Sequence, residues 1–190
     1  MVEDQNFLRV KQFFFLIIFF FIFQSNSFTQ NYSFQKLIEI DGPWGSSFIN
    51  NNEIIFTEKS GKIKIVDINS KRVTEIKHNL NYLVHGQGGL LDILFKDNFI
   101  YISYSENRGN GQSSTSIAKA KFNKNKLNFK NIFQAEPPIN SGYHFGSRLA
   151  IKGNNLFASA GERGKGMIAQ DPTKHPGSII RINLDGSIPE

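Results

Sequence analysis

Two glycine-rich segments of this chain carry polar side chains suited to proton transfer and ligand binding. In residues 85–93 (HGQGGLLDI) and 143–151 (YHFGSRLAI), Gln87 and His144 each stand two residues before a glycine, and an apolar strand pattern follows. Polar groups at the ends of neighbouring strands suit a shared pocket, because the strands fix their spacing while the loops leave them exposed. The repetition predicts a site built by a repeating fold.

His144 is the first catalytic candidate, because an imidazole can accept a proton near neutral pH. Tyr143 and Phe145 would give it a semi-apolar setting. A structural histidine that caps a turn is the alternative interpretation. His85 raises the same question on the first segment.

Gln87 and Arg148 are candidates for ligand binding. The glutamine amide offers an acceptor oxygen and donor hydrogens, which suits a ligand rich in carbonyl and carboxylate groups. The same side chain could simply hold its loop together. Arg148 suits an anion, or an acidic side chain on a neighbouring repeat.

The elements that must position these residues are short β-strands broken by Gly, Asn, Asp and Lys, with no helix of normal length. Lysine and isoleucine alternate in residues 62–65, which is typical of a strand with one buried face. The expected strands form three groups: residues 45–48, 53–58, 62–67 and 72–77; residues 89–95, 99–105, 116–122 and 131–134; and residues 146–151, 156–160 and 178–184.

The spacing of these groups predicts an all-β fold of the β-propeller type. The glycines that open them, Gly45, Gly89 and Gly146, lie about 44 and 57 residues apart, and four short antiparallel strands per repeat are typical of a propeller blade. An ordinary β-sandwich is the alternative. Propellers close with about four to eight blades, and only about three, the last incomplete, fit in residues 28–190. We therefore expect residues 28–190 to be the N-terminal part of a longer propeller domain.

Residues 1–27 have the pattern of a secretory signal peptide. The unbroken apolar run over residues 13–23 would form a helix of roughly 16 Å, too short for a hydrocarbon core of roughly 30 Å. Two basic residues precede the run and small residues follow it. The predicted location is periplasmic or secreted, with no stable membrane insertion after cleavage. A retained membrane anchor is the alternative.

Composition narrows the class of partner. The chain has no cysteine, so an exported fold would rest on its core rather than on disulfides. Its formal net charge of +6 comes from lysines that are spread singly, whereas nucleic-acid binding usually needs a basic cluster or stripe. We therefore expect no nucleic-acid partner.

Six segments resemble one known family in sequence and in order: residues 42–63 (GPWGSSF, then IIFTE and GKI), 85–92 (HGQGGLLD), 101–105 (YISYS), 144–149 (HFGSRL), 161–171 (GERG, then AQD) and 177–189 (GSIIRINLDGSIP). The chain resembles the soluble PQQ-dependent aldose sugar dehydrogenases, the glucose/sorbosone dehydrogenase family of six-bladed β-propellers. The resemblance covers nearly everything after the leader.

This resemblance implies a role for each candidate residue. His144 would be the general base that takes a proton from the anomeric hydroxyl of an aldose while hydride passes to PQQ, which yields the lactone. Gln87 would contact the cofactor, and Arg148 and Tyr143 would contact substrate or support the site. A calcium ion would polarise the quinone, with its ligands downstream of this chain and no metal ligand within it. A separate electron acceptor would reoxidise the cofactor.

Two departures from the family pattern qualify these expectations. Ser147 stands where the family usually has glycine, so its side chain is expected to narrow the floor of the pocket. The family's later arginines and its calcium loop are missing, so this chain alone is expected to be an inactive fragment. The alternatives are a non-catalytic exported propeller that binds a sugar or a protein, and a lactonase-like hydrolase.

The leader gives a first testable prediction. Because small residues follow a short apolar run, N-terminal sequencing of the exported protein should show cleavage close to Ser27. An intact Met1 on protein that stays embedded in the membrane would contradict the signal-peptide interpretation.

Overall fold

The computed structural model describes residues 32–190, so the predicted leader lies outside the described residues. Residues Lys36–Glu190 form one compact unit. Within residues 32–190, no helix has the length and apolar character needed to span a bilayer. The regular secondary structure of the described residues is β-strand except for one short 3-10 helix, as the sequence predicts.

The first sheet contains four consecutive antiparallel strands: β1 (Pro43–Asn50), β2 (Glu53–Glu58), β3 (Lys62–Asp67) and β4 (Val73–His78). The lysine–isoleucine alternation in β3 produces the predicted one-sided strand. Ile63 and Ile65 are 0% and 5% exposed, whereas Lys62 faces solvent. Lys64 is half-buried and pairs with Glu58 at 2.5 Å.

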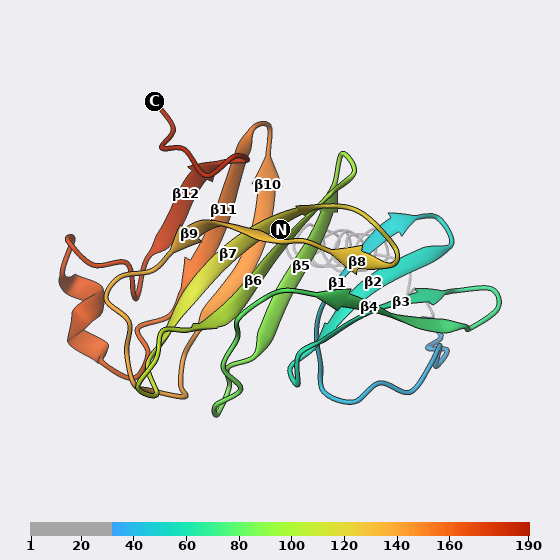
Figure 1. The fold of residues 1–190 in the computed structure, drawn as a ribbon, viewed down its shortest axis with the longest axis horizontal. Helices are drawn as coiled ribbons and strands as arrows, with labels where there is room; N and C mark the ends of the chain where they lie inside the picture. Colours follow the sequence, from blue (N-terminus) through green and yellow to red (C-terminus); the bar gives the residue numbers. More distant parts are fainter. Residues whose placement is uncertain (1–31) are drawn as a thin grey trace, which may run out of the picture. The chain divides into compact units, whose positions relative to one another are not determined.

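The second sheet is ordered β5 (Leu90–Lys96), β6 (Phe99–Asn107), β7 (Ser113–Lys121) and β9 (Lys130–Gln134). The third sheet is ordered β10 (Gly146–Lys152), β11 (Asn155–Ala160) and β12 (Ile179–Asn183). The three sheets follow one another side by side, and each begins at its inner strand, β1, β5 or β10 (Figure 1). These are the blades of a partial β-propeller, which confirms the predicted fold class.

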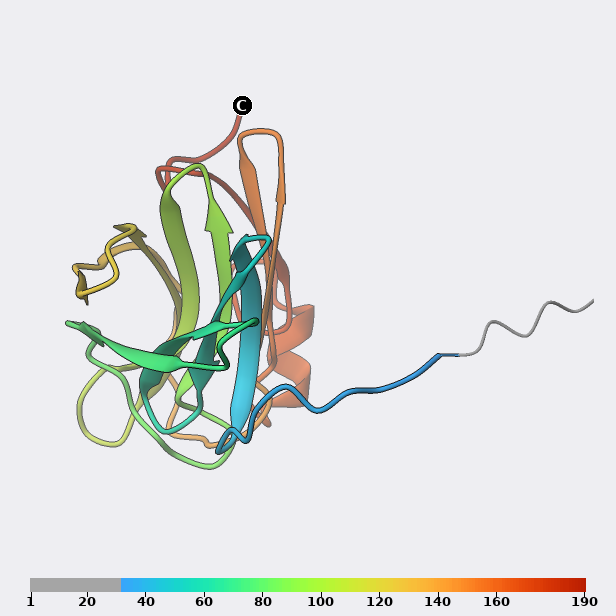
Figure 2. The ribbon, with the colours of Figure 1, turned by 90° about the vertical axis from the view of Figure 1, so that its right-hand side faces the viewer.

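The structure contains two short elements that the sequence does not predict. The two-residue strand β8 (Lys126–Leu127) belongs to the loop between β7 and β9 but pairs in parallel with β4, so the second blade's chain is tied to the first sheet. A 3-10 helix, η1 (Gly166–Gln170), lies in the loop between β11 and β12, beside the third sheet (Figure 2).

Apolar side chains fill the spaces between successive sheets. One buried cluster joins the first and second sheets, and Ile55, Ile93 and Ile102 within it are fully buried. A second cluster joins the second and third sheets around Ile117 and Leu156. Burial of each such side chain contributes roughly 1.5–3 kcal/mol, so the alternating apolar residues hold the blades face to face.

Each inner strand carries a β-bulge at the same place. The pairing with the second strand of the blade shifts register between Pro43 and Ser46 in β1, between Leu90 and Ile93 in β5, and between Gly146 and Leu149 in β10. A bulge leaves backbone groups unpaired in the ladder and re-aims the strand. The bulges in β5 and β10 follow directly after the loops that carry Gln87 and His144, so they set how those two loops meet.

A hydroxyl group lies opposite each bulge and satisfies its backbone. Thr57, Ser103 and Ser159 accept hydrogen bonds from the bulge amides of Gly45 (3.0 Å), Asp92 (2.9 Å) and Arg148 (3.1 Å). The first two hydroxyls also donate to the bulge of the next blade, Thr57 to the carbonyl of Leu91 at 2.5 Å and Ser103 to the carbonyl of Ser147 at 2.6 Å. We call this arrangement the bulge relay. It links neighbouring inner strands through one atom per blade.

The bulge relay predicts a specific stability loss. Thr57→Val keeps the shape of a fully buried side chain but leaves the Gly45 amide and the Leu91 carbonyl without their partner. We expect a loss of about 1–3 kcal/mol in the free energy of unfolding, measured by denaturant titration. Thr74→Val, at an exposed position of β4, is the matched control and should stay within about 0.5 kcal/mol. Equal effects of the two substitutions would contradict the relay.

Candidate active site

His144 lies in the turn that leads into β10, with its backbone in the left-handed region at φ 48°. A non-glycine residue in this region is unfavourable and persists when its surroundings hold it there. The side chain is about half exposed, at 54%. The turn therefore presents an accessible imidazole on a constrained backbone.

The Nδ1 atom of His144 contacts Oε1 of Glu162, which lies in the loop after β11. The hydrogen bond with His144 holds the pKa of Glu162 below its ordinary value of 4.5. The carboxylate is therefore ionised at neutral pH and only accepts hydrogen bonds. In the neutral imidazole, the proton then lies on Nδ1 and the lone pair on Nε2. Since the pKa of Glu162 is lowered, the stabilisation from this hydrogen bond is fully present above the ordinary glutamate pKa. It is lost as the pH falls through the lowered pKa of Glu162.

Gln87 meets His144 directly, as the paired glycine motifs predict. Its side-chain Oε1 accepts a hydrogen bond from the His144 backbone amide at 2.8 Å, and the Gln87 backbone N–H donates to the Gly142 carbonyl at 2.7 Å. The two loops touch through glycines: a Cβ on Gly86 would lie 2.5 Å from the Gly142 carbonyl oxygen. Gln87 thus holds the two loops together, while no acceptor among residues 32–190 takes its side-chain NH₂.

Arg148 and Tyr143 occupy different surroundings. Arg148 donates from Nη1 to Asp92 of the neighbouring blade at 3.2 Å and lies over the Trp44 ring of the first blade at 5.1 Å. Asp92 is 4% exposed and also accepts from the Leu149 amide at 2.9 Å, so this group joins three blades. Arg148 is therefore placed to support the inner strands.

Tyr143 is 62% exposed, and its ring stands edge-on to the His144 imidazole with centroids 6.1 Å apart. Its backbone is fixed on both sides, by the Ser141 hydroxyl at the amide and by Arg163 at the carbonyl. His85, the second histidine candidate, is exposed on the Gln87 loop, and no carboxylate of the described chain pairs with its ring.

The expectation that Ser147 narrows the pocket floor is wrong. Ser147 is fully buried, and its hydroxyl donates to the Phe145 carbonyl at 3.1 Å. Its φ of 79° lies in the left-handed region, which explains why glycine would suit this position. The side chain turns into the sheet instead of toward His144.

Three residues at or beneath the site were not identified as candidates from the sequence: Asp92, Glu162 and Arg163. Asp92 could have been noticed as a carboxylate inside an otherwise apolar strand pattern, since a buried charge needs partners. Glu162 and Arg163 follow Gly161 at the end of a strand, which is where loop residues of a site commonly lie. Nothing in the spacing links them to His144.

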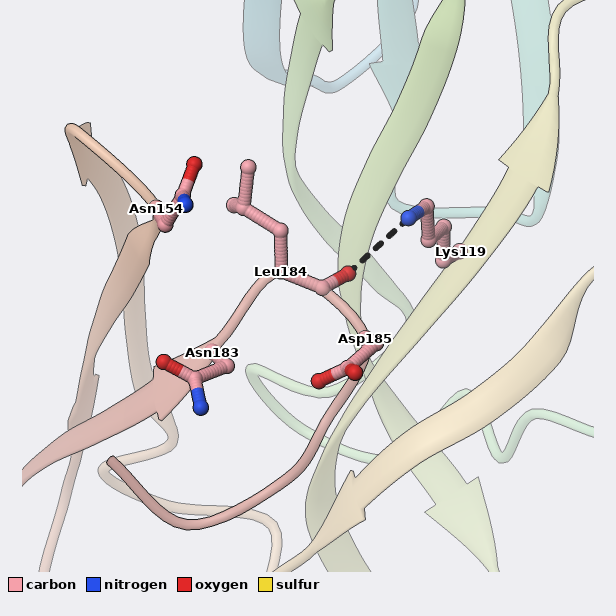
Figure 3. A pocket seen from close by; sticks show the side chains of 5 residues that line it. All are labelled: Lys119, Asn154, Asn183, Leu184 and Asp185. Carbon is pink, nitrogen blue, oxygen red and sulfur yellow. Dashed lines mark hydrogen bonds between the residues drawn. The ribbon is translucent and has the colours of Figure 1, made fainter. Parts of the chain in front are cut away.

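A separate hollow lies away from His144, between β7 and the ends of the third sheet (Figure 3). It measures about 390 Å³ and is lined by Lys119, Asn154, Asn183, Leu184 and Asp185. Lys119 donates to the Leu184 carbonyl at 3.0 Å, and the Ser187 hydroxyl donates to Asp185 at 2.7 Å. The lysine bond joins the second and third blades, and the serine bond closes a turn of the third, so both groups already have partners in the protein.

Comparisons with known proteins agree with this fold. The aldose sugar dehydrogenase YliI of Escherichia coli is 28% identical over 162 residues, which cover 80% of this chain and 44% of that protein. The crystal structure of the soluble aldose sugar dehydrogenase of Escherichia coli in its apo-form has a TM-score of 0.74 and 28% identity, and the match covers 79% of this chain and 46% of that one. The PQQ-bound aldose sugar dehydrogenase of Streptomyces coelicolor has the same fold, with a TM-score of 0.68, 23% identity and coverage of 78% and 46%.

The chain thus spans less than half the length of these relatives. Residues 40–190 match the sequence model of the family described as Glucose / Sorbosone dehydrogenase. That match takes in all three blades and the loops that carry Gln87, His144 and Glu162, and the chain belongs to the glucose/sorbosone dehydrogenase family.

Proposed function

We propose that His144 is the general base of a PQQ-dependent site that oxidises the anomeric hydroxyl of an aldose to the lactone. The observation that carries this proposal is the contact of His144 Nδ1 with the ionised Glu162, which leaves Nε2 free to accept a proton. Membership of a family of sugar dehydrogenases supports the class of reaction.

The residues present fit one edge of a cofactor rich in carbonyl and carboxylate oxygens. The side-chain NH₂ of Gln87 is exposed and has no acceptor within residues 32–190, so it can donate to such an oxygen. The bare glycine backbones of Gly86 and Gly142 lie beside it. When bound, PQQ would supply the acceptor for the hydride, a proton with two electrons, that leaves the anomeric carbon.

The family resemblance also implies a calcium ion. In residues 32–190, no group of three or more His, Cys, Asp or Glu side chains is arranged to hold a metal. The steps proposed for this chain are proton transfer, orientation and ligand contact by its own side chains.

The geometry gives each side chain a step. The anomeric O–H bond breaks and its proton moves to Nε2 of His144. Glu162, which contacts Nδ1 on the other side of the ring, stabilises the imidazolium that forms. Gln87 keeps the imidazole in place through the backbone amide of His144. The exposed ring of Tyr143 offers an apolar face beside the imidazole, against which a sugar ring can pack.

The cellular setting is proposed from the sequence. Residues 1–27 would direct export to the periplasm or the medium, and residues 28–190 would supply the first blades of the propeller. A separate protein or small molecule would accept the electrons. The single spacing of the basic residues predicts no nucleic-acid partner.

The role of His144 gives a kinetic prediction. In the protein that carries this chain, reconstituted with PQQ and calcium, His144→Ala should lower kcat for aldose oxidation by about 10²–10⁴-fold, because a positioned general base typically contributes that much. His85→Ala, an exposed histidine on the adjoining loop, is the matched control and should keep kcat. Near-normal kcat for His144→Ala would reject the general-base assignment. No aldose oxidation by the unsubstituted, reconstituted protein would favour a non-catalytic sugar- or protein-binding propeller.

Gln87 has two contacts that can be separated by substitution. Gln87→Glu keeps an oxygen to accept from the His144 amide but loses the NH₂ donor, so PQQ binding should weaken by about 0.5–1.5 kcal/mol while kcat at saturating PQQ is kept. Gln87→Ala removes both contacts and should lower kcat as well. If the two variants have the same kcat, the amide oxygen does not position His144.

A further inference from the structure

Arg163 is a buried cation that the proposed reaction does not use. It is 2% exposed, and no carboxylate within residues 32–190 accepts a hydrogen bond from its guanidinium. Burial lowers its pKa to about 10, so the guanidinium stays charged at neutral pH. A buried charge is unfavourable unless hydrogen bonds replace its hydration, so its acceptors indicate what it holds.

All the hydrogen-bond acceptors of this guanidinium are neutral oxygens on two segments. Nη1 and Nη2 donate to the carbonyl and hydroxyl of Ser113 at the start of β7, each at 2.9 Å. Nε donates to the Tyr143 carbonyl at 3.1 Å, and Nη2 also donates to the Ser141 carbonyl. The guanidinium carbon lies 3.6 Å from the centre of the Phe145 ring. Arg163 therefore anchors residues 141–145, the turn that contains His144, to the second blade.

Backbone contacts next to Arg163 also hold the turn that contains His144. The Arg163 amide donates to the His144 carbonyl at 3.3 Å, and the preceding residue, Glu162, contacts the imidazole. Both His144 and Arg163 have left-handed backbones, at φ 48° and 59°. Glu162 thus holds the ring of His144, while Arg163 holds the His144 carbonyl and the peptides that precede it.

The shape of the acceptor set selects arginine. A planar guanidinium can donate in several fixed directions at once and stack on an aromatic face, whereas a lysine ammonium is a compact charge on a flexible stem. Here the donors reach acceptors on both segments while one face covers Phe145. A lysine in this space would keep the charge and lose most of the geometry.

We propose that Arg163 is the positioning residue of His144: its guanidinium fixes the turn so that Nδ1 faces Glu162 and Nε2 faces the ligand side. The inference rests on the proposed role of His144 and explains how that role is maintained in a left-handed turn. Arg163 itself touches neither substrate nor cofactor in this arrangement.

The test is ¹⁵N NMR of the imidazole groups in the cofactor-free chain at neutral pH, with His144 assigned by a His144→Asn variant. In the unsubstituted protein His144 should be the Nδ1–H tautomer, the reverse of the Nε2–H preference of a histidine side chain in water. Arg163→Lys should lose this single tautomer and shift toward Nε2–H. Arg181→Lys, which changes an exposed arginine whose Nη2 donates to the Glu190 carbonyl, is the matched control and should leave His144 unchanged. His85 serves as an internal reference.

A folded Arg163→Lys variant in which His144 keeps the Nδ1–H tautomer would overturn the proposal. If Arg163→Lys does not fold, the same spectrum is measured on Ser113→Ala, which removes one acceptor of Nη2 and should broaden or shift the His144 signals relative to His85. Unchanged His144 signals in that variant would also overturn it. Failure of the proposed function gives a different result, since His144→Ala would then retain activity whatever the tautomer of His144.

Discussion

The bulge relay is the constraint on which the rest of this structure depends. Each inner strand departs from regular pairing near its start, and a single hydroxyl satisfies the bulge amide there. Because Thr57 and Ser103 also bond the next bulge, the spacing of neighbouring blades is fixed at the point where the site loops begin. The contact between Gln87 and His144 is possible only when that spacing is correct.

The site itself is held mainly by atoms that do no chemistry. His144 is contacted through its amide by Gln87, through its carbonyl by Arg163 and through its ring by Glu162. These contacts come from two different blades, so the turn is determined from both sides. A left-handed histidine can persist under such conditions because its neighbours outweigh its local preference. Glu162 thus holds the Nδ1 side of the imidazole, and the Nε2 side is left for a ligand.

The sequence predicts the strands well and the site only in part. Alternation and turn residues are local, so the strands of all three blades were expected within a few residues, while the two-residue β8 is too short to have a pattern. The meeting of Gln87 and His144 follows from matching glycine motifs. Glu162 and Arg163 could not be placed, because their partners depend on how the β10–β11 hairpin folds back. Ser147 was misjudged because the bulge turns it inward.

One repeated position also explains how similar blades avoid exchanging partners. At the amide that enters the bulge, the first blade has Gly45, the second Asp92 and the third Arg148. Asp92 fits only against a residue without a side chain, since a Cβ on Gly45 would lie 2.6 Å from its carboxylate oxygen, and Arg148 in turn needs that carboxylate. Repeat proteins are prone to docking the wrong units during folding. A glycine, an aspartate and an arginine at the equivalent position make the interface between the first and second blades different from that between the second and third. These three residues therefore favour one order of blades along the inner wall.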